Sequence, residues 1–172
     1  MNLDGYTYTA LDFAGLLIRK HFPERTDGES AVIRAYLLEH LAEFDSMTFA
    51  KRIGRGIPAD PSHLPGVQAN SDFSGKLKID ILAWKGSQPF LIEVKQRVTP
   101  AALGQILTYR HEFLTEFPDA PEPVLVVVGR EASENAIPAL TAHGITVYLY
   151  PDANVSGHAS GVGVRPDGGA AA

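Results

Sequence analysis

The chain has 172 residues, of which 45% are hydrophobic and none is a cysteine, and its formal net charge at pH 7 is −5. This length allows one domain with a substantial core. The missing cysteines exclude disulfides, thiol nucleophiles, iron–sulfur clusters and cysteine-based zinc sites. No apolar run is long enough to cross a bilayer, and the polar segment 1–10 does not resemble a signal peptide. We therefore expect a cytoplasmic protein with no membrane partner, in which any metal is held by oxygen or imidazole ligands.

Basic residues are concentrated in the middle of the chain. The segment 51–110 holds nine Lys and Arg but four Asp and Glu, a net charge of +5, whereas the remaining residues carry −10. A basic middle between acidic flanks favours a local phosphate-binding surface, and chance variation or a simply solvated loop is the alternative. The candidate contacts to nucleic acid are Lys51, Arg52, Arg55, Lys76, Lys78, Arg97 and Arg110.

Two helices are expected before this basic segment. Apolar residues recur at helical spacing over 11–21 and again over 27–44. The second helix has N-cap candidates in Thr26 and Asp27, and Glu29 falls in its first turn, where a negative charge suits the helix dipole. The segment 54–70 is rich in Gly and Pro and predicts a loop.

The centre of the chain predicts three strands. A weak one lies within 67–74, and two clear ones lie over 77–84 and 89–94, the last continuing to Lys95. The connection 85–88 joins the clear strands into an antiparallel hairpin. The later elements are a helix that starts near Thr99 and Pro100, a buried strand of the parallel type, a short helix and a final apolar strand, over 100–117, 123–129, 133–143 and 145–150.

The resulting order is helix, three strands, helix, strand, helix, strand. It predicts a single α/β domain over 1–150 with a mixed central sheet flanked by helices. From 151 to 172 the composition shifts to Gly, Ala and Ser, which predicts a flexible tail.

Two carboxylates and a lysine carry the strongest chemical signal. Glu93 and Lys95 are two apart on one predicted strand, so they point to the same face. The hairpin places Asp80 roughly opposite Glu93, where two carboxylates repel each other unless a cation or a proton intervenes. Such oxygen ligands suit Mg²⁺ combined with phosphate oxygens, with Lys95 placed to act on water or phosphate. A surface ion pair between Glu93 and Lys95 is the alternative interpretation.

A second pair of polar residues lies on the helix that follows. Gln105 and Tyr109 are four apart and share a helix face. The series Ile79-Asp80, Glu93-Val94-Lys95 and Gln-x-x-x-Tyr resembles the PD-(D/E)xK phosphodiesterase superfamily, and the helix motif is similar to its RecB-like and lambda-exonuclease-like branches. The resemblance covers about 27–150. Ile79 stands where the proline of the family name would be.

The resemblance implies a restriction-endonuclease-like core and a Mg²⁺-dependent deoxyribonuclease, with Mn²⁺ as the expected substitute. It assigns metal binding to Asp80, Glu93 and the carbonyl of Val94. It adds Glu29, because the family often carries an acid on its first helix that binds metal directly or through water. The other interpretation of Glu29 is an ordinary first-turn helix acid.

The resemblance also implies that Lys95 is the catalytic lysine. Gln105 and Tyr109 would help to position this lysine, the water or the DNA backbone. The sequence does not separate DNA from RNA, or an endonuclease from an exonuclease. It leaves open whether the chain acts alone, as a homodimer or with a helicase or another partner protein. A non-catalytic nucleic-acid-binding or interaction module that keeps the nuclease fold is the alternative function.

Overall fold

A computed structural model describes residues 5–56, 62, 64–66, 75–153, 161–167 and 170–171. In these residues eight strands form one sheet whose neighbours follow the order of the chain. The strands are β1 (Tyr6–Thr9), β2 (Ser46–Ile53), β3 (Leu77–Lys85), β4 (Gln88–Val98), β5 (Val124–Ala132), β6 (Thr146–Leu149), β7 (Val162–Val164) and β8 (Ala170–Ala171). The helices are α1 (Phe13–Leu17), α2 (Asp27–His40), α4 (Ala101–Glu116) and α5 (Ala136–Thr141), with short 3₁₀ turns at Ala10–Asp12 and Leu41–Glu43.

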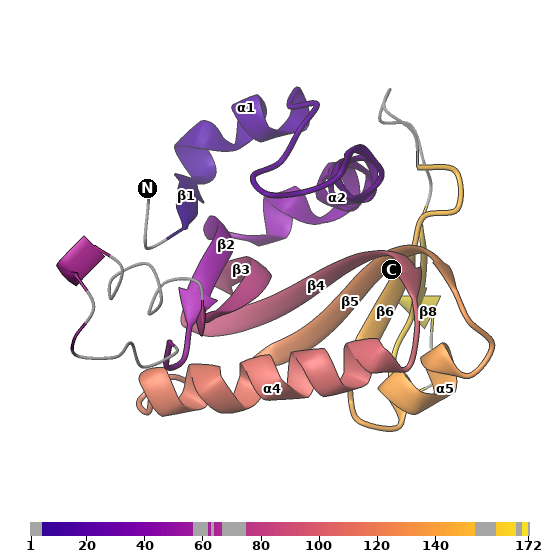
Figure 1. The fold of residues 1–172 in the computed structure, drawn as a ribbon. Helices are drawn as coiled ribbons and strands as arrows, with labels where there is room; N and C mark the ends of the chain where they lie inside the picture. Colours follow the sequence, from indigo (N-terminus) through magenta and orange to yellow (C-terminus); the bar gives the residue numbers. More distant parts are fainter. Residues whose placement is uncertain are drawn as a thin grey trace.

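Helices cover both faces of the sheet (Figure 1). α1 and α2 lie on one face, and α4 and α5 lie on the other. β5 pairs in parallel with β4 and β6, and the other neighbouring strands are antiparallel. The predicted α/β class with a mixed sheet between helices is therefore confirmed. In the part of the chain that the structure describes, no helix is both long and apolar enough to span a membrane.

Local signals fix where the main elements begin. The Thr26 hydroxyl accepts a hydrogen bond from the Glu29 N–H, and the Glu29 carboxylate accepts one from the Thr26 N–H. This capping box satisfies two N–H groups that the start of α2 would leave without partners. In the hairpin, Lys85 pairs with Gln88, and Gly86 takes a φ of +58° that other residues adopt only at a cost. The predicted helix start and the predicted hairpin are both confirmed.

The structure also differs from the prediction. On the edge away from β4, β3 pairs with β2, a strand that was not predicted, although Met47 and Phe49 alternate in the period-two manner of a strand. The weak strand predicted within 67–74 lies outside the described residues. The helix predicted over 11–21 is shorter and is divided between a 3₁₀ turn and α1. β7 and β8 come from the segment for which composition predicted a flexible tail, and β7 pairs with β6.

Two apolar clusters hold the helices to the sheet. The cluster beneath α1 and α2 includes Val32, Ile92 and Val126, and the cluster beneath α4 and α5 includes Leu91 and Phe113. Ile92 and Leu91 are neighbours on β4 and belong to opposite clusters, as the alternation of a strand requires. The central strands are thus buried on both faces. Glu93, one position beyond Ile92, is therefore also buried.

Candidate active site

The central sheet divides between β3 and β4. The β3–β4 ladder ends at the pair Ile81↔Ile92. Beyond this pair β3 remains paired with β2, and β4 remains paired with β5. The next residues on the two separating strands are Asp80 and Glu93. We call this opening, bordered by Asp80 and Glu93, the fork.

β3 turns over at Asp80. Ile81 packs in the cluster beneath α2, whereas Ile79 packs in the cluster beneath α4. Two residues this close in a regular strand would share a face, so the strand rotates between them. On the neighbouring strand, Ala50 stands between the residues that pair with Ile79 and Ile81, and it takes a φ of +55°, which is uncommon for a residue other than glycine. The Asp80 carboxylate lies at this local distortion of the two strands.

Asp80 is buried and fully engaged. Its exposed fraction is 4%. The Arg25 guanidinium lies 2.7 Å from Oδ1, and the Val94 N–H donates to Oδ2 at 2.9 Å. Burial raises the pKa of Asp80, while the guanidinium and the Val94 N–H act in the opposite direction. Sequence reasoning missed Arg25, which directly precedes the predicted N-cap Thr26.

Glu93 is the less satisfied of the two carboxylates. It is fully buried, and within the described part of the chain neither of its oxygens accepts a hydrogen bond of good geometry. The Lys95 ammonium lies in ion-pair contact with Oε1. Burial, followed by the charge of Asp80, raises the pKa of Glu93 to about 8. The charged form of Glu93 is therefore disfavoured until a further cation approaches.

The Gln-x-x-x-Tyr pair lies on α4, which covers the face of the sheet toward which Glu93 points. Gln105 donates its amide N–H to the Tyr109 hydroxyl at 2.6 Å. Tyr109 is buried, and burial followed by the charge of Glu93 raises the pKa of Tyr109. The structure thus brings Tyr109 into the electrostatic neighbourhood of Glu93, and it keeps the phenol protonated.

Glu29 lies near the fork but serves the helix. One of its carboxylate oxygens accepts from the Thr26 N–H at 3.0 Å and from the Thr26 hydroxyl at 2.9 Å. Its charge contributes to raising the pKa of Asp80, after larger effects of burial. The geometry supports the first-turn helix acid interpretation, and a metal role for Glu29, direct or through water, stays a prediction.

The donor set at the fork fits a hard divalent cation. Among the described residues, no three His, Asp or Glu side chains gather closely enough to hold a metal by themselves. Mg²⁺ commonly takes one or two carboxylates and completes its shell with water and substrate phosphate. Glu93 offers two buried oxygens without hydrogen bonds, and each Asp80 oxygen keeps a second lone pair. Two carboxylates therefore suffice, provided that substrate or water supplies the other ligands.

The predicted nucleic-acid contacts fall into separate groups. Arg52 on β2 and Lys78 on β3 lie opposite each other in the strand register, beyond the fork. Arg55 lies at the end of β2, where it lines a pocket of about 470 Å³ with His111. Lys51 lies near the C-terminal end of β2, and Lys76 directly precedes β3. Arg97, on β4, lies 3.7 Å from Glu131.

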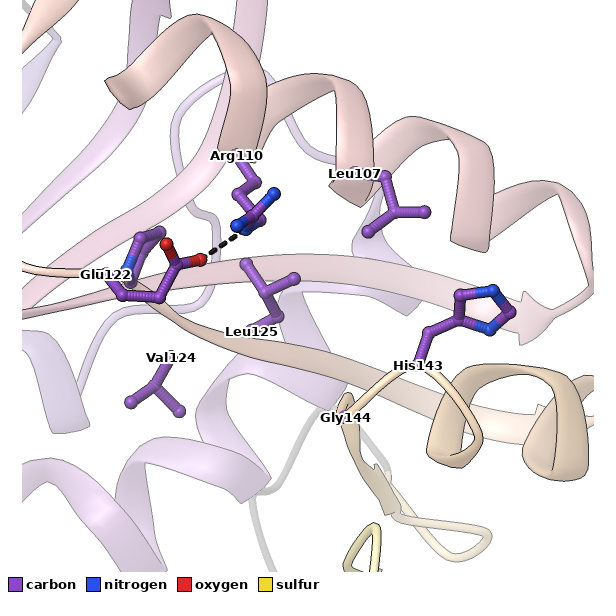
Figure 2. Close-up of a pocket in the computed structure, with 8 residues that line it drawn as sticks. Leu107, Arg110, Glu122, Val124, Leu125, His143 and Gly144 are labelled. Carbon is purple, nitrogen blue, oxygen red and sulfur yellow. Dashed lines mark hydrogen bonds and ion pairs between the residues drawn. The ribbon is translucent and has the colours of Figure 1, made fainter. Parts of the chain in front are cut away.

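Arg110 lies elsewhere (Figure 2). It pairs with Glu122 at the edge of a second pocket, of about 620 Å³, to which Leu125 and His143 also contribute. Leu125 pairs with Leu91, so this pocket is at the level of the sheet on the hairpin side of Glu93. The structure does not bring Arg110 to the fork.

Comparisons of the chain with models of protein families, with curated proteins and with solved structures give no match.

Proposed function

We propose that this chain is a metal-dependent nuclease with a restriction-endonuclease-like core, and that it hydrolyses phosphodiester bonds in DNA at the fork. The observation that carries the proposal is the placement of Asp80 and Glu93. Two buried carboxylates face each other where the β3–β4 ladder ends, one of them lacks hydrogen bonds, and Lys95 stands beside it. A buried pair of carboxylates is costly unless cations or a proton neutralise it, and a bound Mg²⁺ would add its charge to those of Arg25 and Lys95.

Asp80, Glu93 and the Val94 carbonyl would hold the metal. When bound, Mg²⁺ neutralises charge on the phosphate and lowers the pKa of water. The fork itself supplies a dry setting in which these charges act strongly, because Glu93 has no exposed surface. Metal binding also favours the charged form of Glu93, which burial disfavours.

Lys95 and Tyr109 supply the remaining polar groups. The Lys95 side chain is 31% exposed, so its ammonium reaches from Glu93 to solvent and to an incoming phosphate. Water attacks the phosphorus and loses a proton to solvent, the P–O bond to the leaving oxygen breaks, and that oxygen takes up a proton from solvent. Lys95 donates hydrogen bonds that orient the water or stabilise charge on the phosphate. Because Tyr109 accepts the Gln105 N–H, its own hydroxyl proton is available for another acceptor in the fork.

The test is cleavage of linear and circular DNA, single- and double-stranded, with Mg²⁺, with Mn²⁺ and with EDTA. We expect cutting that requires the metal, and a rate that falls by at least about 100-fold in Glu93→Gln and in Lys95→Met. Lys85→Met is the matched control, since Lys85 is an exposed lysine at the far end of the same hairpin. Circular substrates separate an endonuclease from an exonuclease.

Thermal denaturation of each variant verifies that it is folded. Cutting that persists in Glu93→Gln, or that is lost equally in Lys85→Met, contradicts the assignment of the fork. The absence of cutting under every condition, with no effect of Mg²⁺ on thermal stability, overturns the enzymatic function.

A non-catalytic nucleic-acid-binding module is the second candidate, and Arg25 is the observation that favours it. With Arg25 on Asp80 and Lys95 on Glu93, each carboxylate already has a protein cation. Such a module would bind DNA equally well in EDTA and in Mg²⁺, and it would keep this binding in Glu93→Gln.

A further inference from the structure

The turn before α2 bridges the two branches of the fork. On the β2–β3 branch, Glu24 contacts Arg52 and Lys78. On the β4 branch, the Gln96 amide donates to the Thr26 hydroxyl at 3.3 Å. The turn is therefore held on both sides of the opening that leads to Asp80 and Glu93.

Two cations from adjacent strands converge on one oxygen of Glu24. Lys78 Nζ lies 2.8 Å from Oε2, and Arg52 donates to the same atom at 3.3 Å. The bond from Lys78 is the largest cause that lowers the pKa of Glu24, and the charges of Arg52 and Arg25 act in the same direction. The position of Glu24 Oε2 therefore has several positively charged neighbours and suits an anionic oxygen.

The backbone of Glu24 is unusual as well. Its φ of +56° lies in the left-handed region, which residues other than glycine and asparagine rarely adopt. Non-glycine residues persist there only when their surroundings hold them, and such positions are enriched at functional sites. The two ion pairs anchor the Glu24 side chain, and the Arg25 N–H donates to the Phe22 carbonyl at 3.2 Å in the same turn.

A phosphodiester offers the same chemistry as the Glu24 carboxylate. Its non-bridging oxygens carry the negative charge of the backbone, and Arg and Lys are the side chains that bind them. The Glu24 side chain is 40% exposed, so an incoming phosphate can reach it. The side chains of Lys78 and Arg52 are only 25% and 16% exposed, so Glu24 is the exposed partner through which a phosphate would gain access to them.

We propose that Arg52 and Lys78 form a binding site for a backbone phosphate of the nucleic acid, and that Glu24 occupies this site as an internal competitor until substrate displaces it. The inference rests on the proposed function, since it takes nucleic acid as the substrate. It adds where a phosphate next to the scissile one binds.

The first arm of the test measures DNA binding in EDTA, where cleavage is absent. Fluorescence anisotropy of a short labelled DNA duplex gives the Kd of Glu24→Gln, in which the charge is removed and the shape is kept. An internal competitor reduces apparent affinity by the fraction of molecules in which it occupies the site, so Glu24→Gln is expected to bind about five-fold more tightly. Asp27→Asn controls for the change in net charge. It removes a nearby carboxylate that forms an ion pair with His21.

The second arm asks whether the gain depends on the cations. Lys78→Gln is expected to weaken binding and to reduce the salt dependence of log Kd by about one phosphate contact. In a Lys78→Gln background, Glu24→Gln is expected to give no further gain. Lys85→Gln, on the same strand but at the hairpin, controls for the loss of a positive charge.

The outcomes separate this inference from the nuclease proposal. Unchanged or weaker binding in a folded Glu24→Gln protein, or a gain that Asp27→Asn reproduces, overturns the internal competitor even if the wild-type chain cuts DNA. Tighter binding that vanishes without Lys78 supports the site even if the chain does not cut. Circular dichroism and thermal melting establish that each variant is folded.

Discussion

The two ends of α2 lie in two polar clusters that are built differently, one around the partly exposed Glu39 and one around the buried Glu93. At its C-terminal end, the Glu39 carboxylate accepts from the Tyr150 hydroxyl at 2.8 Å and from the Gly161 N–H at 3.0 Å. There His40 Nδ1 lies 2.7 Å from Glu43, and its ring packs against two tyrosines. At the N-terminal end, the fork holds two buried carboxylates, and apart from its ion pair with Lys95, Glu93 has no hydrogen-bond partner in the described part of the chain.

The comparison distinguishes a structural carboxylate from one built for a ligand. Glu39 is matched by donors on both oxygens, so its charge is compensated within the protein. Glu93 combines complete burial, a neighbouring carboxylate and missing hydrogen bonds, which is a destabilising arrangement unless another group completes it. Removing the carboxylate charge of Glu93 in metal-free buffer should therefore stabilise the folded protein, whereas removing that of Glu39 should not.

The largest effect is expected at Arg25. Arg25→Met leaves the Asp80 carboxylate in the interior without its cation, and the exposed fractions of 9% and 3% mean that water cannot replace it. We expect the free energy of unfolding at neutral pH to fall by about 3 kcal/mol in metal-free buffer, as measured by urea denaturation. Adding Asp80→Asn should recover most of this loss. A loss below about 0.5 kcal/mol would mean that the pair behaves as a surface ion pair.

The next effect is a pH dependence at Glu93. Its pKa is about 8 in the folded protein, against an ordinary value of 4.5. Between these values the folded state binds more protons than the unfolded state, so the free energy of unfolding falls as pH rises through this window. Without metal, Glu93→Gln is expected to remove this fall and to gain about 2 kcal/mol at the alkaline end.

Glu39→Gln is the matched control for this measurement, because its carboxylate is compensated by Tyr150 and Gly161. Thermal melting across the pH range in EDTA gives the comparison. A gain in Glu39→Gln equal to that in Glu93→Gln would remove the distinction between the two ends of α2.

A smaller effect is expected at Tyr150. Tyr150→Phe deletes the hydroxyl that donates to Glu39 and leaves the fully buried ring in place. The free energy of unfolding should fall by about 1 kcal/mol, the usual value of one buried hydrogen bond. Metal-dependent cleavage should be unchanged, because the hydroxyl belongs to the other end of α2. A cleavage defect in a folded Tyr150→Phe protein would show that the two clusters are coupled.

Much of this fold could be predicted because its signals are local. The start of α2 is encoded in Thr26 and Glu29, three residues apart, and the hairpin in the alternation that flanks Gly86. A hairpin with a short turn fixes its own register, so Asp80 and Glu93 could be placed opposite each other from the sequence. Helical spacing placed Gln105 and Tyr109 on one face of a helix, whereas the role expected of Tyr109 came from the resemblance to the nuclease superfamily.

The remaining features depend on contacts between distant segments. Arg25 reaches Asp80 only because α2 packs across the sheet, and nothing in the residues around Arg25 announces that partner. β2 was not predicted, because the charged residues Lys51 and Arg52 near its end obscured the alternation of Met47 and Phe49. The rotation of β3 at Asp80 follows from packing on both faces, which no single-strand pattern contains.

The smallest effect is expected at Arg110, which the sequence grouped with the nucleic-acid contacts. Its side chain is 42% exposed and that of its partner Glu122 is 58% exposed, so solvent screens the pair. Arg110→Gln should change the free energy of unfolding by less than about 0.5 kcal/mol. In the anisotropy assay, its Kd for DNA should stay close to that of the wild-type chain, whereas Lys78→Gln weakens binding. Equal losses in the two variants would instead mean that the bound DNA extends over α4 to the pocket beside His143 (Figure 2), away from the fork.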